Sequence, residues 1–311
     1  MAHENGAAAE DEFAADAVMA ALGRLGYAGQ RFGDVRELAA ALAAGHRWDT
    51  VLNLTEGPYG REAEVPSLLG LYGIPCVGPD PLTATLIQHK ALAKHMLRAA
   101  GLPTAPFHVV DDVAALESHD FSYPVFAKPV GEYSSRGIDA RCRAHDPAQL
   151  RRAVAGLLST FRQPVLVENY LPGREFSVGI LGTGTAARVL GVLDIRLGEQ
   201  AEGLYSYSVK RAGTAEAGYL GWHLADDREA QQAAESALSA WKLLGCRDVG
   251  RIDLRGDAHG RPHLLEINSP PGLCPDWSDL VLLTAHLGWS YDELIDAILT
   301  SALSGQTERE S

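Results

Sequence analysis

Two short runs near the C-terminus decide the fold: Gly250-Arg251-Ile252-Asp253 and Leu265-Glu266-Ile267-Asn268-Ser269-Pro270-Pro271-Gly272. Each belongs to an apolar stretch, residues 249–254 and 263–267, and a turn-forming segment separates the two stretches. This pattern predicts a β-hairpin. Because alternate side chains of a strand share a face, the hairpin is expected to gather four polar side chains on one side: Arg251, Asp253, Glu266 and Asn268.

These four side chains favour a site for a cation and phosphate groups. Carboxylate and amide oxygens are ligands that Mg²⁺ prefers, and a fixed arginine beside them neutralises charge during phosphoryl transfer. The competing interpretation is an exposed hairpin with ordinary surface charges. Carboxylates embedded among apolar strand residues are costly unless they are paired or metal-bound, which favours the first interpretation.

Composition excludes several classes of protein. A chain of 311 residues has room for two or three lobes, and 46% hydrophobic with 22% charged residues is typical of globular proteins. The formal net charge of −13 argues against a nucleic-acid binder. The four cysteines show neither zinc-site nor disulfide-framework spacing. With no signal peptide and no apolar stretch long enough to span a bilayer, a cytoplasmic location is expected.

The first 80 residues are predicted to form a lobe with a small parallel sheet. Helices are expected at 10–25, 35–44 and 63–71, and short strands at 49–54 and 75–78. Such lobes usually open with a strand, and none precedes the first expected helix, so this lobe is expected to lack its first strand. The turn Gly78-Pro79-Asp80-Pro81 marks its end.

Two further subdomains are expected, at 81–170 and 171–311. For the central one the sequence predicts helices at 83–100 and 147–159 and strands at 107–110, 123–128, 138–143 and 165–170. For the C-terminal one it predicts strands at 175–181 and 186–195, the hairpin, and helices at 228–244 and 291–304. The expected class is α/β, with α+β lobes, in three units: 1–80, 81–170 and 171–311.

Several connecting segments suit a nucleotide. The Gly/Ser-containing loop 131–137 suits phosphate oxygens, although alone it is more often a simple turn. Lys128 ends an apolar run just before it, where a lysine acts as a point charge on phosphates. Glu168 and Glu175 flank a turn and suit adenine and ribose groups, with a charged interdomain turn as an equal alternative. The aromatic and basic segment 205–211 suits a cover over an anionic site or a plain surface loop.

In combination and order, these motifs resemble the ATP-grasp superfamily, specifically the D-alanine–D-alanine ligase family, over nearly the whole chain from about residue 10. The two quoted runs are the most specific matches, and the turn Gly173-Arg174-Glu175 is intact. Weaker matches lie at 53–57, 73–78, His89-Lys90, Ala127-Lys128-Pro129 and 133–137. The resemblance implies an ATP-grasp fold preceded by an N-terminal parallel-sheet lobe.

The resemblance also implies roles for individual residues. The ATP-binding residues would be Lys90, Lys128, Ser134, Ser135, Glu168, Tyr170, Leu171, Glu175 and Lys210. The ligands of two Mg²⁺ ions, for which Mn²⁺ is a substitute, would be Asp253, Glu266 and Asn268. The catalytic residues would be Arg251, which stabilises the oxyanion, Lys210, which reaches the γ-phosphate, and Ser134.

The family pattern for the amino-acid substrates is altered in this sequence. Glu10, or Glu12, stands as the counterpart of the glutamate that holds the first substrate's ammonium, without the strand and glycine pair that precede it in the family. Arg211 replaces a tyrosine after the loop lysine. The segment that binds the second substrate's carboxylate reads Cys274-Pro275-Asp276-Trp277-Ser278, in which only Ser278 matches.

Three functions therefore stay open. The first is an ATP-dependent carboxylate–amine ligase that joins amino-acid-like substrates through an acyl phosphate and releases ADP and phosphate. The second is an authentic D-alanine–D-alanine ligase of cell-wall synthesis, and the third is a nucleotide-binding protein without catalysis. Small-molecule substrates and a homodimer are expected, with neither nucleic acid nor membrane as a partner.

Overall fold

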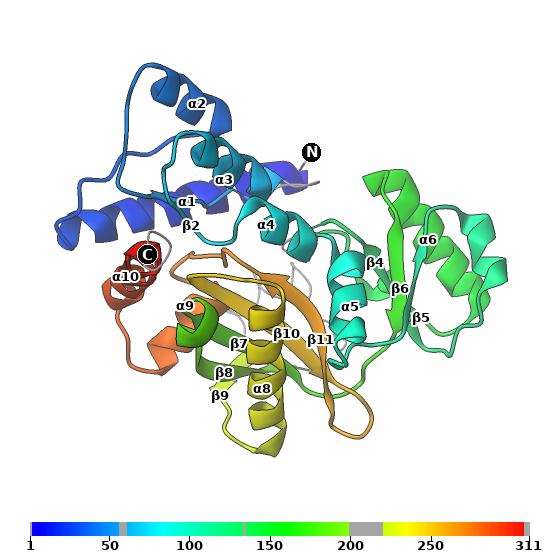
Figure 1. Ribbon diagram of the computed structural model, residues 1–311. Helices are drawn as coiled ribbons and strands as arrows, with labels where there is room; N and C mark the ends of the chain where they lie inside the picture. The colour runs from blue at the N-terminus through cyan, green and yellow to red at the C-terminus, as the bar shows by residue number, and fades with distance from the viewer. Residues whose placement is uncertain (1, 56–60, 133–134, 199–219, 308–311) are drawn as a thin grey trace.

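Two antiparallel sheets and a short parallel sheet organise the computed structural model, which describes residues 2–55, 61–132, 135–198 and 220–307 (Figure 1). The larger sheet has five strands in the order β11-β10-β7-β8-β9. Their bounds are β7 Glu175–Leu181, β8 Arg188–Leu197, β9 Leu220–Leu224, β10 Val249–Gly256 and β11 Pro262–Asn268. The predicted hairpin is confirmed as the antiparallel pair β10–β11 at the edge of this sheet.

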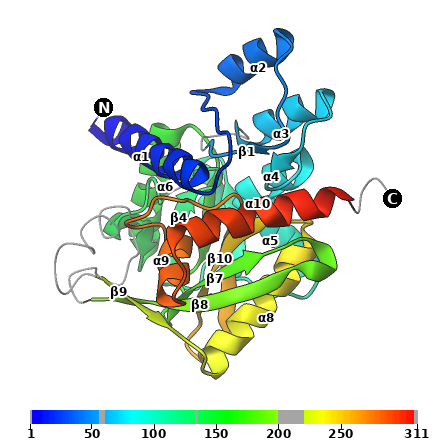
Figure 2. The ribbon, with the colours of Figure 1, turned by 90° about the vertical axis from the view of Figure 1, so that its left-hand side faces the viewer.

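Helices cover both faces of the five-stranded sheet. On one face, α8 (Arg228–Leu243) buries Trp241 against the apolar side chains of β7 and β10. On the other face lie α9 (Asp279–His286) and α10 (Tyr291–Thr307), with α1 (Ala2–Arg24) packed on α10 (Figure 2). Burial on two faces explains why every residue of the central strand β7 is buried.

Strand β10 divides its residues strictly between the two faces. Ile252 and Leu254 are fully buried in the core under α8, and Gly250 lies so close to Trp241 that a Cβ would overlap the indole ring. Arg251 and Asp253 point to the opposite face. A glycine is therefore required by packing at the first position of the motif, while the charged positions are available for chemistry.

The smaller sheet has four strands in the order β3-β6-β4-β5, at the right in Figure 1. Their bounds are β3 Phe107–Val110, β4 Val125–Pro129, β5 Arg143–Ala144 and β6 Val165–Asn169. Helix α6 (Pro147–Phe161) packs on one face and forms a separate apolar core with it. The strand predicted at 138–143 was mostly wrong: Asp139 accepts from the Arg141 amide and starts a 3₁₀ turn, Ala140–Cys142, before β5.

A helix pair connects the two sheets. The single helix predicted at 83–100 is divided into α4 (Pro81–Gln88) and α5 (Lys90–Ala99), because His89 has non-helical backbone angles and its ring caps α5 by accepting from the Leu92 amide. In Figure 1, α5 lies between the sheets. Its Ala91 packs with residues of the four-stranded sheet, whereas Leu97 belongs to the core under α8.

The N-terminal lobe is sparse by comparison. It contains α2 (Val35–Ala43), α3 (Arg61–Leu71) and the strands β1 (Val51–Leu52) and β2 (Cys76–Val77). The parallel pairing predicted for this lobe is confirmed, with two residues in each strand. Among the described elements, α9 and β9 were not predicted, and neither were the 3₁₀ helices Val113–Ser118 and Gly184–Ala186. Across the described ranges, no helix is both long and apolar enough to cross a membrane.

Candidate active site

A cavity of about 690 Å³, its open mouth included, lies between the two antiparallel sheets. Charged and aromatic side chains converge on it, as in small-molecule sites. Strands β4 and β6 contribute to one wall, and β7, β10 and β11 to the other. Eight of the residues predicted from the sequence line it together: Lys128, Ser135, Glu168, Tyr170, Leu171, Glu175, Asp253 and Glu266.

At one end of the cavity, a buried carboxylate lies between two lysines. Glu168 is 4% exposed; its Oε1 is 2.7 Å from Lys128 Nζ and its Oε2 is 2.9 Å from Lys94 Nζ. Burial alone would raise the pKa of Glu168, but the two ammonium groups outweigh it and lower the pKa to about 2. Burial lowers the pKa of Lys94, whereas for Lys128 the nearby carboxylates outweigh burial and raise the pKa. The carboxylate is therefore ionised at neutral pH.

A second carboxylate of the cavity is held by an arginine. Arg255 donates to Glu175 Oε2 at 3.2 Å and to the Tyr170 hydroxyl at 3.1 Å. The Tyr170 ring also lies within 5.2 Å of the guanidinium carbon of both Arg255 and Arg143. These contacts fix an aromatic ring and a carboxylate side by side, an arrangement that suits a planar base and sugar hydroxyls.

The carboxylates of the hairpin meet across its two strands. Asp253 pairs in register with Glu266, and Arg251 pairs with Asn268, so the predicted common face is confirmed. Asp253 Oδ1 accepts from the Ser177 hydroxyl at 2.8 Å, and its Oδ2 accepts from the Asn268 amide at 3.2 Å. Two carboxylates and an amide in one patch are hard oxygen donors, so the residues present fit a divalent cation such as Mg²⁺.

Arg251 lies between two carboxylates. Its Nε and NH2 groups donate to Asp253 Oδ2 at 3.2 and 3.0 Å, and its NH1 group donates to Asp279 Oδ2 at 2.8 Å. Asp279 is 2% exposed and begins α9. Because both partners are ionic and the site is buried, the guanidinium is held in a single orientation next to the carboxylates of Asp253 and Glu266.

Lys90 approaches the same carboxylates from α5. Its ammonium donates to the Glu132 carbonyl and lies 3.6 Å from Glu266 Oε2. Burial lowers the pKa of Lys90, and the Glu266 charge opposes this. Glu132 belongs to the loop predicted to bind phosphates, so Lys90 connects that loop to the hairpin.

Some predicted site residues lie outside the part of the chain that the structure describes. Ser134, Lys210 and Arg211 are in this group, and so is the side chain of Glu10, whose backbone belongs to α1. Ser278 is buried, and its hydroxyl accepts from the Cys274 amide at 2.9 Å within the turn that leads into α9. Its role as a substrate residue stays a prediction.

Among the polar residues that hold the site's carboxylates and Arg251, four were not predicted: Lys94, Ser177, Arg255 and Asp279. Arg255 follows Asp253 at the next alternate position of β10, and Lys94 follows Lys90 by one helical turn, so strand and helix periodicity contained both. Ser177 and Asp279 reach the site through strand register and the packing of α9. No local sequence pattern indicates contacts of that kind.

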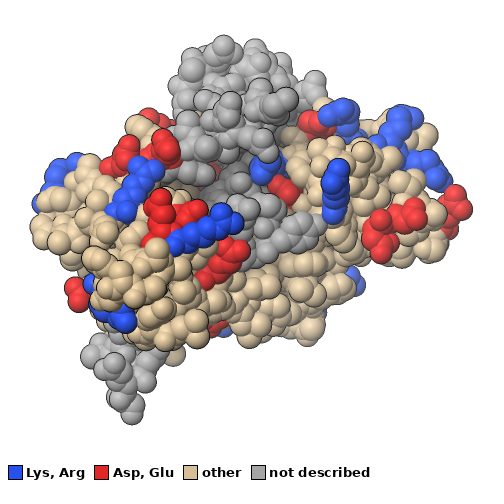
Figure 3. Space-filling view, turned by 90° about the horizontal axis from the view of Figure 1, so that it is seen from above, with Lys and Arg blue, Asp and Glu red and all other residues tan. Residues whose placement is uncertain are grey.

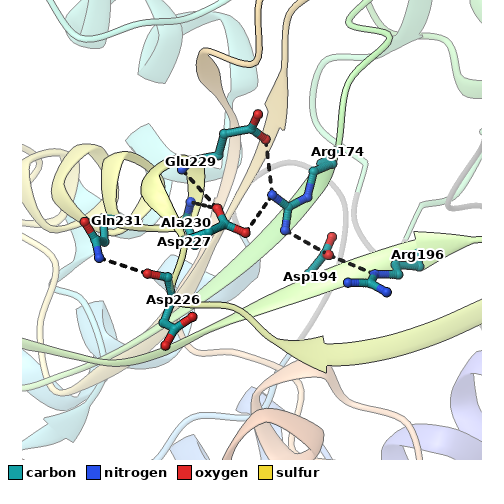
Figure 4. Close-up of polar contacts among 8 residues, drawn as sticks. All are labelled: Arg174, Asp194, Arg196, Asp226, Asp227, Glu229, Ala230 and Gln231. Atoms are coloured by element: carbon teal, nitrogen blue, oxygen red, sulfur yellow. Dashed lines mark hydrogen bonds and ion pairs between the residues drawn. The ribbon is translucent and has the colours of Figure 1, made fainter.

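In the turn Gly173-Arg174-Glu175, the two charged side chains have different surroundings. Arg174 points away from the cavity carboxylates toward three acidic side chains, Asp194, Asp227 and Glu229, at 3.0, 2.9 and 3.3 Å (Figure 4). It thereby connects the start of β7 to β8 and to the first turn of α8. Only Glu175 of this motif enters the cavity.

The charged surface is mixed in sign. On the face seen in Figure 3, the described acidic and basic side chains lie interspersed around the centre of the molecule. On this face the described charges form no patch of a single sign.

Comparison with known proteins identifies relatives of one kind. A family model described as "D-ala D-ala ligase C-terminus" matches residues 96–300. The D-alanine–D-alanine ligase of Bordetella petrii is 34% identical over 270 residues, which cover 86% of this chain and 79% of that protein. An uncharacterized protein, y4sG, of Sinorhizobium fredii is 34% identical over 254 residues, covering 81% of this chain and 74% of that protein.

Solved structures show the same fold. The D-alanine–D-alanine ligase from Bacillus anthracis complexed with ATP has a TM-score of 0.75 at 20% identity, covering 96% of this chain and 94% of that one. The VanG D-Ala:D-Ser ligase from Enterococcus faecalis has a TM-score of 0.67 at 24% identity, covering 82% and 73%.

Proposed function

This chain belongs to the D-alanine–D-alanine ligase family of the ATP-grasp superfamily, and we propose that the cavity between its sheets binds Mg·ATP to activate a carboxylate for amide formation. Members of this family are ATP-dependent ligases that join amino-acid substrates, and the chain is an enzyme of that type. The observation that supports the proposed site is the registered pair Asp253 and Glu266, which shares one cavity with Lys128, Glu168 and Glu175.

The nucleotide would lie along the cavity with its base near Glu168. An ionised carboxylate accepts hydrogen bonds only, and the 6-amino group of adenine is a donor. Glu175 would accept from the ribose hydroxyls while Tyr170 and Leu171 contact the base. Lys128 and Lys90 would face the phosphates, together with the loop that carries Ser135 and Ser134.

A divalent metal ion is required by enzymes of this family, and the residues that would hold it are Asp253, Glu266 and Asn268. When bound, Mg²⁺ offsets the negative charge of the triphosphate. Our proposal includes two ions and the ability of Mn²⁺ to replace Mg²⁺. Arg251 already holds one side of Asp253, which leaves the carboxylate oriented before any cation arrives.

The reaction proceeds in two steps. An oxygen of the substrate carboxylate attacks the γ-phosphorus of ATP, the bond from phosphorus to the β–γ bridging oxygen breaks, and ADP leaves. The amine nitrogen of the second substrate then attacks the acyl carbon, loses a proton, and expels inorganic phosphate as the carbon–oxygen bond breaks. Arg251 donates to the oxyanion that forms on the acyl carbonyl, and losing such a donor typically costs about 10²–10³ in rate.

We propose substrates other than a pair of D-alanines. The support is the altered substrate pattern: Arg211 stands where the family has a tyrosine, and in the segment 274–278 only Ser278 matches. An authentic D-alanine–D-alanine ligase is the second candidate, because relatives of that name match most of the chain.

Release of ADP from Mg·ATP, measured against pairs of D- and L-amino acids with mass spectrometry of the products, tests the proposal. We expect a product from a pair other than two D-alanines. Robust turnover with D-alanine alone would establish the second candidate. Binding of ATP with no ADP release for any pair would instead favour a nucleotide-binding protein without catalysis.

A homodimer and a cytoplasmic location complete the proposal. Both follow from the family resemblance and the sequence features described above rather than from contacts within one chain. Light scattering of the purified protein at several concentrations tests the dimer, for which a mass of twice the 33.3 kDa chain is expected.

A further inference from the structure

Lys94 lies behind the wall of the cavity and is not among the described residues that line it. It is 1% exposed, and it reaches Glu168 from the opposite side to Lys128. We propose that Lys94 is a positioning residue that fixes the Glu168 carboxylate, so that the cavity selects a 6-amino purine nucleotide over a 6-oxo one. This inference rests on the proposed function, because it takes the cavity to be the nucleotide site.

The contacts of Lys94 exclude a direct role in ligand binding. Its Nζ is 2.8 Å from Thr104 Oγ1, 3.0 Å from the Leu264 carbonyl oxygen and 2.9 Å from Glu168 Oε2. Two hydrogen bonds and one ion pair therefore surround this ammonium, and all three partners belong to the protein. Lys128, in contrast, lines the cavity. Both lysines hold the carboxylate, but only Lys128 also lines the cavity where a ligand would bind.

Two ammonium groups on one carboxylate have a specific effect on hydrogen bonding. Each oxygen of Glu168 has its own cation, so the group can neither rotate nor take up a proton without losing an ion pair. The lowered pKa of Glu168 agrees with this. A permanently ionised carboxylate accepts from a 6-amino group, whereas it repels the lone pairs of a 6-oxo group.

The use of lysine in this chain supports a dedicated role. The sequence contains only five lysines against 22 arginines, so arginine supplies most of its positive charge. Three of the five, Lys90, Lys94 and Lys128, are buried together at the cleft. Three oxygens within 3.0 Å surround the tip of Lys94, and a compact ammonium fits that space better than a planar guanidinium does.

Lys94 also connects the two antiparallel sheets. Helix α5 lies between the sheets, and Lys94 contacts Glu168 on β6 and Leu264 on β11. A purely structural bridge would weaken the binding of every nucleotide equally when it is removed. A positioning role predicts a change in the ratio between two nucleotides that differ only at position 6.

The test compares dissociation constants for Mg·ATP and Mg·ITP, measured by calorimetry on the full chain without amino acids. We expect the wild type to bind ATP roughly tenfold or more tightly than ITP. The 6-oxo group of ITP would place an acceptor against the Glu168 carboxylate, which then gains no hydrogen bond from the base. Lys94→Met should lose most of this preference. Lys94→Gln, which keeps N–H donors for Thr104 and Leu264, should lose it as well and serves if the Met variant does not fold.

Thr104→Val is the matched control. It removes a contact of Lys94 but leaves both ion pairs of Glu168, so the preference for ATP should persist. The wild-type preference should stay constant from pH 8 to pH 5, whereas in the Lys94 variants it should decrease as the pH falls, because Glu168 then has one cation fewer and is protonated more readily.

Three outcomes separate the possibilities. An unchanged ATP-to-ITP ratio in both Lys94 variants would overturn the inference and leave the proposed function intact. Equal binding of the two nucleotides by the wild type would also overturn it. If the wild type binds neither nucleotide, the proposed function itself fails.

Discussion

The two ends of the cleft have opposite ratios of cationic to carboxylate side chains. At the nucleotide end, one carboxylate lies between two cations; at the reaction end, one cation lies between two carboxylates. The members of the nucleotide end are Lys94, Lys128 and Glu168, and those of the reaction end are Arg251, Asp253 and Asp279. Under the proposed function, the net positive charge of the first end would suit a nucleotide, and the net negative charge of the second would suit metal ions and an amine. The contrast supports the proposal that one cleft has two differently charged sites for its two reactants.

The largest effect is expected from the hairpin carboxylates. The double change Asp253→Asn with Glu266→Gln should reduce ADP formation by about 10³-fold or more, because the neutral amides would bind a divalent cation far more weakly. The measurement is steady-state ADP release at saturating Mg²⁺. Glu235→Gln, on the exposed face of α8, is the control and should leave the rate unchanged. Undiminished nucleotide consumption in the double variant would break the assignment of the reaction end.

A smaller effect is expected when the nucleotide end is acidified. The pKa of Glu168 is about 2 in the folded protein, whereas the ordinary value of a glutamate is 4.5. The stabilisation that its ion pairs provide is therefore complete above pH 4.5 and decreases as the pH falls toward 2. Between pH 7 and pH 3 the wild type should therefore lose roughly 2 kcal/mol of unfolding free energy from this group.

Urea unfolding of the wild type and Glu168→Gln at both pH values isolates that contribution. The glutamine variant has no group to titrate at this position, so its loss should be smaller by roughly the same amount. Equal losses in the two proteins would show that the lysines do not hold an ionised carboxylate.

The smallest effect is expected at Asp279. Asp279→Asn keeps an oxygen for Arg251 NH1 but removes the charge, so turnover should fall by about five- to tenfold while the dissociation constant of ATP stays within about twofold. Single-turnover kinetics and nucleotide titration distinguish the two quantities. A marked loss of ATP affinity would place Asp279 functionally at the nucleotide end and erase the contrast between the ends.

Much of the fold was predictable because periodicity is local. The alternation in residues 249–254 predicted both the hairpin and its charged face, and the bounds of β7 were predicted to the residue. The break at His89 was missed because no helix-breaking residue marks it, and the His89 ring that caps the start of α5 has no clear local sequence signal. Residues 138–143 contain strand-forming letters, yet the cap by Asp139 directs them into a turn.

The site was predictable to the extent that its residues belong to recognisable motifs. Lys128, Glu168 and Glu175 were named from their segments, and they share the cavity. Lys94 was overlooked because a lysine on a helix is usually solvated, and nothing local indicates that two sheets enclose it. Asp279 was overlooked because its meeting with Arg251 depends on how α9 packs across 28 residues of chain.

Gly250 and Ile252 alternate with Arg251 and Asp253, so the motif is subject to two separate constraints. Gly250 and Ile252 are constrained by packing against Trp241 and the core, whereas Arg251 and Asp253 are assigned to the reaction by our proposal. In a relative that had lost ligase activity, we therefore expect substitutions at the positions of Arg251 and Asp253, while those of Gly250 and Ile252 stay unchanged. The sequence of this tetrapeptide would thus distinguish an inactive relative from an active one.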